Sequence, residues 1–159
     1  MQDCGGVRQL AFSPAGSQFI AAGMKEPGGG FAKGSPVLQL FDWESGKQLH
    51  ELVPGDSQDG FIYDAWFHPE GFIAGTASAF PGKGKLFFWK PGDEKPFYIG
   101  NKLTNGRSIS LHPDGRRLAF TMSNSRNANG RPLKDGEYAG GTAKIHILTF
   151  PEAVSAAAS

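Results

Sequence analysis

Cysteine is nearly absent from this sequence of 159 residues, which contains Cys4 alone. A single thiol excludes an intramolecular disulfide, so the fold has to be stabilised by its apolar core. The sequence also lacks an apolar run long enough to cross a membrane as a helix. Residues 1–6 have neither the basic start nor the apolar stretch of a signal peptide, and we therefore expect a cytoplasmic location.

A large excess of charge of either sign is missing too, because the formal net charge is +1. Proteins that bind nucleic acids or anionic membranes do so through clustered positive charge. We therefore expect that neither a nucleic acid nor a membrane is the main partner.

Recognisable catalytic and metal-binding motifs are also lacking. There is no Gly-x-Ser-x-Gly elbow, and His50 and His146 have no Cys, Asp or Glu at the spacing of metal ligands. His68 and His112 are explained by the tight turns in which they lie. We expect no catalytic residue, no cofactor site and no metal site, and hence no enzyme activity.

Glycine and proline are abundant, with 23 and 11 copies, and they mark a turn that recurs three times. The three copies read Ser13-Pro14-Ala15-Gly16, His68-Pro69-Glu70-Gly71 and His112-Pro113-Asp114-Gly115. Proline presets φ for the second position of a tight turn, and glycine tolerates a positive φ at its end. Three copies in the same context predict a repeat protein.

Each repeat predicts four short strands, because an alternating apolar segment precedes the turn and others follow it. The expected strands of the first two repeats cover residues 7–12, 18–23, 37–42 and 48–53, then 61–67, 72–78, 85–89 and 95–99. The third repeat predicts strands over 108–111, 117–122 and 144–148, and its tail lacks a convincing fourth strand. We expect Pro96 to place the strand 95–99 at a sheet edge, and we expect a loop over 123–141.

This pattern resembles the WD40 repeat, especially the bacterial type that is rich in the Ser/His-Pro-x-Gly turn. The segment from Val37 to Asp42 is similar to the third strand of that family, which ends in Trp-Asp, with Phe41 in the place of Trp. Trp89-Lys90 keeps the Trp, whereas the Gly-His pair that precedes the first strand is absent, so we do not expect the family's Asp–His–Ser–Trp network. The resemblance implies an all-β fold of β-propeller blades with four antiparallel strands each. The three blades would cover about 7–53, 61–99 and 106–150 of a single, partial propeller domain over 1–159.

Three blades are fewer than the roughly four to eight that close a propeller. A blade completes its core against its neighbours, so we expect the first and last blades to expose apolar faces that fit each other. The residues expected there are Leu10, Phe12, Ile20 and Leu40 at one end, and Ile109, Leu111, Phe120, Ile145 and Ile147 at the other. Two copies would close a ring of six blades, and three copies a ring of nine.

Two long loops, 24–36 and 123–141, should emerge on the face that also carries the connections between blades, 54–60 and 100–106. In the WD40 family this face most often binds partners. The candidate residues for docking a peptide or protein are basic or aromatic: Phe31, Lys33, Arg126, Arg131, Lys134 and Tyr138. The alternative is that the loops are insertions without a function.

These observations predict a non-catalytic interaction scaffold that assembles with itself into a closed ring. The alternative is that the chain is a fragment or accessory domain of a larger propeller-containing protein or enzyme, whose chemistry lies on other parts.

Overall fold

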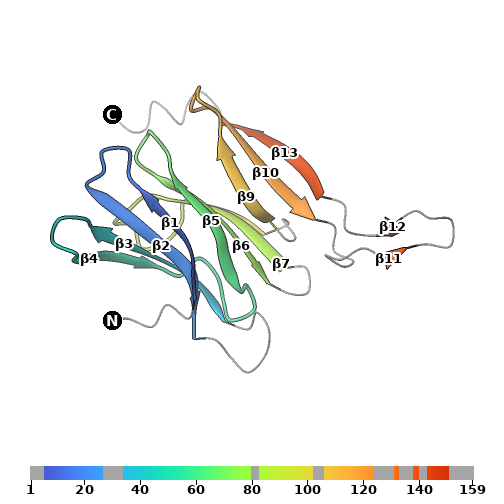
Figure 1. Cartoon of the computed structure of the whole chain (residues 1–159), viewed down its shortest axis with the longest axis horizontal. Helices are drawn as coiled ribbons and strands as arrows, with labels where there is room; N and C mark the ends of the chain where they lie inside the picture. The colour runs from blue at the N-terminus through green and yellow to red at the C-terminus, as the bar shows by residue number, and fades with distance from the viewer. Residues whose placement is uncertain are drawn as a thin grey trace.

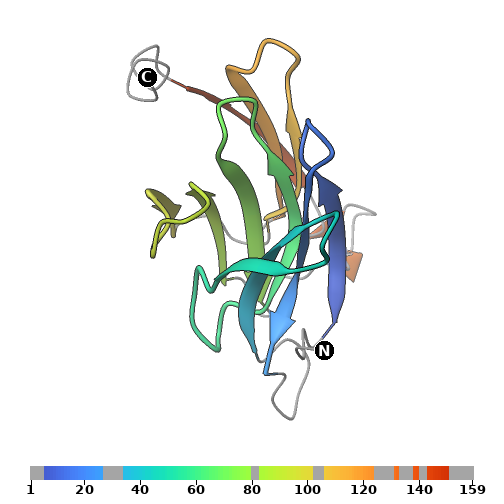
Figure 2. The ribbon, with the colours of Figure 1, turned by 90° about the vertical axis from the view of Figure 1, so that its left-hand side faces the viewer.

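The computed structural model describes residues 6–26, 34–79, 83–101, 106–123, 131–132, 138–139 and 143–150. These residues form strands and turns, and none of them belongs to a helix long and apolar enough to cross a membrane. Three antiparallel sheets follow one another in chain order, as Figure 1 shows. Figure 2 shows from the side that the sheets stand face against face rather than edge to edge.

Blades 1 and 2 are four-stranded sheets whose strands pair in chain order, and blade 3 has three strands in the described residues, with β10 in the middle. Blade 1 contains β1 (Val7–Phe12), β2 (Gln18–Lys25), β3 (Ser35–Asp42) and β4 (Gln48–Leu52). Blade 2 contains β5 (Phe61–Phe67), β6 (Ile73–Ala79), β7 (Lys83–Trp89) and β8 (Tyr98–Gly100). Blade 3 contains β9 (Gly106–Leu111), β10 (Arg117–Ser123) and β13 (Ala143–Thr149).

Two sequence expectations need correction. The fourth strand of blade 2 begins at Tyr98 rather than at residue 95, because Pro96 has no N–H to donate and pairing starts after it. The segment 123–141, expected to be a loop, contains β11 (Arg131–Pro132) and β12 (Tyr138–Ala139), which pair with each other as a short antiparallel ribbon.

The three proline turns adopt one backbone geometry, as the sequence predicts. In each turn the glycine N–H donates to the carbonyl three residues earlier, at 2.8 Å for Gly16 and 2.9 Å for Gly71 and Gly115. Their φ angles are 71°, 83° and 69°, in the left-handed region that favours glycine. The same turn therefore begins the second strand of every blade.

Two apolar clusters fill the junctions between neighbouring blades. Between blades 1 and 2 the buried residues include Ile20, Leu38 and Leu40 from one side and Ile73, Phe87 and Trp89 from the other. Between blades 2 and 3, Phe72, Leu86 and Phe88 meet Ile109, Leu118 and Phe120. The core thus lies between the blades, and β5 is packed against β1 and β2 as β9 is against β5 and β6.

These clusters correct the residues expected on the open ends. Ile20, Leu40, Ile109 and Phe120 are buried at junctions, and Leu111 is half-buried beside the second cluster. Side chains alternate between the two faces of a strand, so an apolar residue can face the neighbouring blade instead of the open side. Only Leu10, Phe12, Ile145 and Ile147 of the expected set are exposed on the open sides.

The connection between blades 1 and 2 is fixed by a nearly buried ion pair. Lys85 Nζ on β7 lies 2.6 Å from Asp59 Oδ2, which also accepts the Asp56 N–H at 2.7 Å. The same connection bonds to the loop of blade 1, because Gly34 N–H donates to the Ser57 carbonyl and Gly60 N–H to the Gly34 carbonyl. The connection and that loop therefore lie on one side of the molecule, as the repeat pattern predicts.

We expect that Gly75→Ala lowers the free energy of unfolding by about 1–3 kcal/mol, the usual cost of overpacking a core. A Cβ at Gly75 would lie 2.2 Å from Cζ of Phe87, whose ring is fully buried between blades 1 and 2. Urea denaturation at a fixed protein concentration measures the loss. Phe87→Leu should restore part of it in the double variant, and equal losses in the single and double variants would contradict the steric explanation.

Candidate functional site

The structure brings together few of the side chains that the sequence marks for docking. Phe31, Lys33, Arg126 and Lys134 lie outside the described residues. Arg131 and Tyr138 belong to the paired strands β11 and β12, where Arg131 pairs with Ala139 and Tyr138 with Pro132. The better-described candidate surfaces are the two outer sides of the blade array.

The open side of blade 1 is an aromatic face, formed by Leu10, Phe12, Phe19, Phe41 and Trp43. Phe19 stacks on Phe41 with ring centroids 4.9 Å apart, and Trp43 meets the Phe12 ring edge-on at the same distance. Leu10, Phe12 and Trp43 are 65%, 56% and 58% exposed. Such a cluster of exposed apolar side chains is unusual for a surface in contact with water, and it is typical of a surface that binds another protein.

The open side of blade 3 is an aliphatic face, formed by Ser110, Ala119, Thr121, Ile145 and Ile147. The strand pairing places Ala119 beside Ile147 and Thr121 beside Ile145. Ile145 and Ile147 are 73% and 62% exposed, although both are large apolar residues. A pocket of about 280 Å³ opens at the turn end of this face, between Ile147, Ala119, Arg117 and His112.

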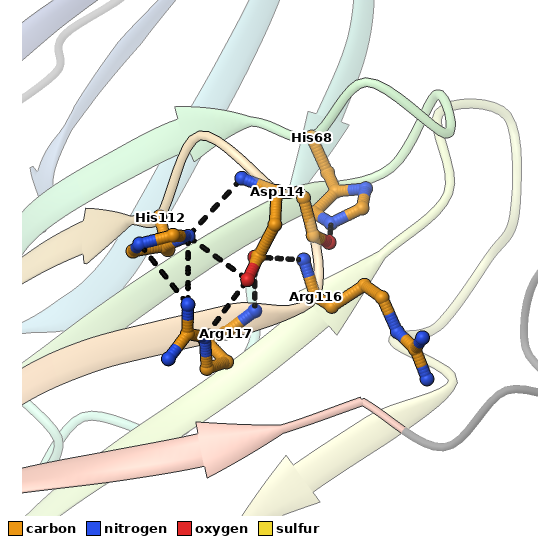
Figure 3. A network of polar contacts seen from close by, with 6 residues as sticks. His68, His112, Asp114, Arg116 and Arg117 are labelled. Carbon is orange, nitrogen blue, oxygen red and sulfur yellow. Dashed lines mark hydrogen bonds and ion pairs between the residues drawn. The ribbon is translucent and has the colours of Figure 1, made fainter.

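The junction between blades 2 and 3 shows how one blade closes on the next, and a histidine of the proline turn takes part. His68 is buried, and its Nε2 lies 2.7 Å from the carbonyl oxygen of Gly115 in the turn of blade 3 (Figure 3). Its Nδ1 accepts the Glu70 N–H at 3.1 Å, so Nε2 carries the hydrogen and donates it to Gly115. The turn of blade 2 is thereby bonded to the turn of blade 3.

The same junction is filled by an aromatic side chain that follows the third strand of blade 3. Phe150 lies among His68, Phe72 and Phe88 of blade 2, with ring centroids 5.2, 5.7 and 5.2 Å away. Its N–H donates to the Arg116 carbonyl, which holds it beside the turn. The His68 ring stacks on Phe72 with centroids 4.1 Å apart, so Phe150 and the three rings around it form one packed unit.

His112 is the equivalent histidine of blade 3, and among the described residues no further blade lies beside it. Its Nδ1 lies 2.9 Å from Asp114 Oδ2, and Arg117 Nη2 lies 3.1 Å from its Nε2 (Figure 3). The Arg116 N–H, together with the side chains of Arg117 and His112, holds the pKa of Asp114 below its ordinary range. Asp114 therefore stays ionised and orders the turn at the edge of the aliphatic face.

A half-buried carboxylate on the inner strand forms a second bond between blades 2 and 3. Asp64 Oδ2 accepts the Ile109 N–H at 2.8 Å, as expected of a carboxylate within an apolar strand. Burial raises the pKa of Asp64 above its ordinary value, and the hydrogen bonds from Ile109, Trp66 and Ala65 offset part of that rise. The carboxylate acts here as an acceptor between blades.

The inner strands also carry a row of stacked cations and rings. The Arg8 guanidinium lies 4.5 Å from the Phe61 ring centroid and 4.7 Å from that of Tyr63. Arg107 approaches Tyr63 at 5.2 Å. Arg8, Tyr63 and Arg107 each stand six residues before the turn proline, so equivalent positions of the three blades contact one another.

Sequence reasoning missed the part that His68 and Phe150 play at the junction of blades 2 and 3, and the aromatic face to which Trp43 belongs. The repeat register contains the signal, because Phe150 and Trp43 both follow the third strand of their blade and both donate their N–H to a residue beside the proline turn, Arg116 and Ser17. The histidines were explained by turn chemistry alone. Within the residues that the structure describes, no three His, Cys, Asp or Glu side chains gather as metal ligands.

Comparison with known proteins supports the fold. No family model matches the sequence, and no curated protein matches it as a relative. Among solved structures, the Dos1 propeller is similar with a TM-score of 0.53 and 12% identity, over 74% of this chain and 30% of that one. A candidate 6-phosphogluconolactonase from Bacteroides fragilis is similar with a TM-score of 0.53 and 11% identity, over 90% of this chain and 42% of that one.

A candidate 6-phosphogluconolactonase from Bacteroides uniformis is similar too, with a TM-score of 0.51 and 14% identity, over 89% of this chain and 43% of that one. The chain therefore has an all-β fold of propeller blades, and it spans less than half the length of these three structures. At these identities the likeness concerns the fold alone.

We expect opposite effects from two substitutions of Asp64. Asp64→Ala leaves the buried Ile109 N–H without an acceptor and should lower the free energy of unfolding by about 1–3 kcal/mol. Asp64→Asn keeps an acceptor oxygen and removes the charge that burial disfavours. Since its pKa is raised in the folded state, Asp64 contributes fully to the free energy of unfolding below its ordinary pKa of 3.8, and this contribution is lost as the pH rises through the folded pKa. The asparagine variant should therefore gain stability relative to wild type between pH 4 and pH 7.

Urea denaturation of both variants across this pH range measures these effects. Equal stability of the alanine and asparagine variants at pH 7 would contradict the acceptor role of Asp64.

We also expect that His68→Ala loosens the junction of blades 2 and 3, lowering the free energy of unfolding by about 2–3 kcal/mol. The variant loses the bond to the Gly115 carbonyl and the stacking on Phe72. His68→Gln can still donate to that carbonyl and should lose less. Thermal unfolding followed by circular dichroism compares the two variants, and a His68→Ala variant as stable as wild type would disprove the contribution of the turn bond.

Proposed function

We propose that this chain is a non-catalytic interaction scaffold of the WD40 type, which joins copies of itself head to tail. The aliphatic face of blade 3 in one copy packs on the aromatic face of blade 1 in the next. This contact repeats the junctions that blades 1, 2 and 3 already form within the chain. The loop-rich side of the resulting ring is then available to a peptide or protein.

The observation that carries the proposal is the pair of uncovered apolar faces at opposite ends of the array. Their most exposed members are Leu10, Phe12 and Trp43 at one end and Ile145 and Ile147 at the other. Burying apolar area stabilises a contact by about 25 cal/mol per Å², so these faces favour a cover. Every other blade face in the chain is covered by the next blade.

The two faces also complement each other in size. Phe19, Phe41 and Trp43 are bulky, whereas Ala119 and Ile147 are smaller and border a pocket. Dense packing requires large side chains to meet small ones. A contact between unlike faces is heterologous, and it closes into a ring when the rotation per copy divides the circle. Two copies give six blades, inside the common range, and three give nine.

A second candidate is that the chain belongs to a larger propeller-containing protein, in which further blades cover the open faces. The length comparison favours this candidate, since the similar solved structures are more than twice as long. Two of those structures are candidate lactonases by name, and an enzyme of this kind would carry its chemistry on blades outside the described residues.

The solution mass, measured by light scattering coupled to gel filtration, distinguishes these candidates. Self-assembly predicts two or three times the chain mass of 17.0 kDa. Ile147→Asp places a charge on the aliphatic face and should return the protein to a folded monomer. Ile99→Asp, a matched change on β8 of blade 2 away from both open faces, should leave the assembly intact. A wild-type monomer at all concentrations would disprove self-assembly and favour the larger protein.

A further inference from the structure

Equivalent positions in the three blades allow the outer contact to be described residue by residue. Counted from the turn prolines, Ser13, His68 and His112 are equivalent, and so are the turn glycines Gly16, Gly71 and Gly115. The strand pairings align the third strands as well, because Leu40 pairs with Ile20 as Ile147 pairs with Ala119. In this register Trp43 of blade 1 is the equivalent of Phe150 of blade 3.

The backbone confirms the equivalence of Trp43 and Phe150. Trp43 N–H donates to the Ser17 carbonyl at 2.9 Å, and Phe150 N–H donates to the Arg116 carbonyl at 2.8 Å. Both acceptors follow the turn glycine directly. Phe150 fills the space beside His68, Phe72 and Phe88 on the preceding blade, whereas Trp43 is 58% exposed. Trp43 is thus placed like Phe150, but no described blade precedes blade 1 for it to pack against.

The aliphatic face of blade 3 carries a pocket that an aromatic side chain could fill. The pocket of about 280 Å³ is bordered by His112, Arg117 and Ile147. The turn of blade 2 is one residue shorter, so the backbone contacts define the equivalence here: the His112 N–H donates to the Arg117 carbonyl as the His68 N–H donates to the Phe72 carbonyl, and Ala119 pairs with Ile147 as Ala74 pairs with Phe88. The three pocket residues are therefore the equivalents of His68, Phe72 and Phe88, which surround Phe150 at the inner junction. An indole is larger than a phenyl ring, and here it replaces phenylalanine where isoleucine replaces Phe88. The Arg117 guanidinium provides a cation where Phe72 provides a ring, and a tryptophan face attracts a cation more strongly than other aromatic faces do.

The turn histidine of blade 3 differs from His68 in its partners. His68 donates from Nε2 to the Gly115 carbonyl of the next blade. His112 Nε2 lies 3.1 Å from Arg117 Nη2 and accepts there, and its Nδ1 lies 2.9 Å from Asp114 Oδ2. Both ring nitrogens are engaged within the turn, so His112 contributes to the wall of the pocket.

We propose that Trp43 of one copy inserts into the pocket between His112, Arg117 and Ile147 of a second copy. This assignment rests on the head-to-tail self-assembly proposed above and fixes its register. It makes Trp43 the anchor of the contact, and it commits the partner to a second copy of this chain.

Replacing the anchor tests the main part of the assignment. Trp43→Ala should weaken self-association about thirtyfold or more, because buried tryptophans are typical interface hot spots. Sedimentation equilibrium of the full chain measures the dissociation constant. The matched control is Ile99→Ala on blade 2, which should change it less than threefold. Equal constants for Trp43→Ala and the control would overturn the assignment.

Disulfide trapping tests the register independently of affinity. The protein is kept at a concentration at which Trp43→Ala still assembles, because a cysteine at position 43 removes the anchor. In a Cys4→Ser background, Trp43→Cys with Ile147→Cys should then form disulfide-linked multimers on mild oxidation, since the equivalent Phe150 and Phe88 side chains are in contact, with ring centroids 5.2 Å apart. The control pair, Ile99→Cys with Ile147→Cys, should stay uncrosslinked. Multimeric wild-type protein whose 43–147 pair fails to crosslink would overturn the register and leave self-assembly standing. Monomeric wild-type protein would overturn both.

Discussion

A blade of this protein has two apolar faces, and it can bury them only against other blades. The apolar clusters between blades 1 and 2 and between blades 2 and 3 provide this burial within the chain. Among the residues that the structure describes, blade 2 alone is covered by a blade on both sides. The apolar core therefore lies between blades rather than within a single sheet. The two exposed outer faces follow from the same need of each blade for a neighbour.

The junction of blades 2 and 3 joins three kinds of interaction at separate points. Its centre is apolar, with Phe72 and Phe88 against Phe120. Its inner edge carries the bond from Ile109 to Asp64, and its turn edge carries the bond from His68 to Gly115. These two hydrogen bonds set the orientation of one blade relative to the next, because each requires one donor and one acceptor at a fixed place. Apolar burial supplies most of the stability, and the edge bonds fix how neighbouring blades align.

Much of the fold can be predicted from the sequence, because turn chemistry is local. Proline and glycine at fixed spacing mark the three turns, and the strands next to them lie within one or two residues of their predicted bounds. The assignment of faces is less predictable. Ile20 and Leu10 are both apolar strand residues, yet the first is buried at a junction and the second is exposed. Which face meets a neighbour depends on how the blades rotate in space, and strand alternation does not contain that information. The roles of His68 and Trp43 depend on the same rotation.

The order of the blades along the chain also matters during synthesis. Each blade pairs strands that are close in sequence, a topology that folds quickly, so blade 1 can form its sheet before blade 2 has left the ribosome. Until then its face with Ile20, Leu38 and Leu40 has no cover, although the finished molecule buries all three side chains completely or nearly so. Blade 2 passes through the same interval before blade 3 emerges. The nascent chain therefore exposes a different apolar surface at each stage of its synthesis.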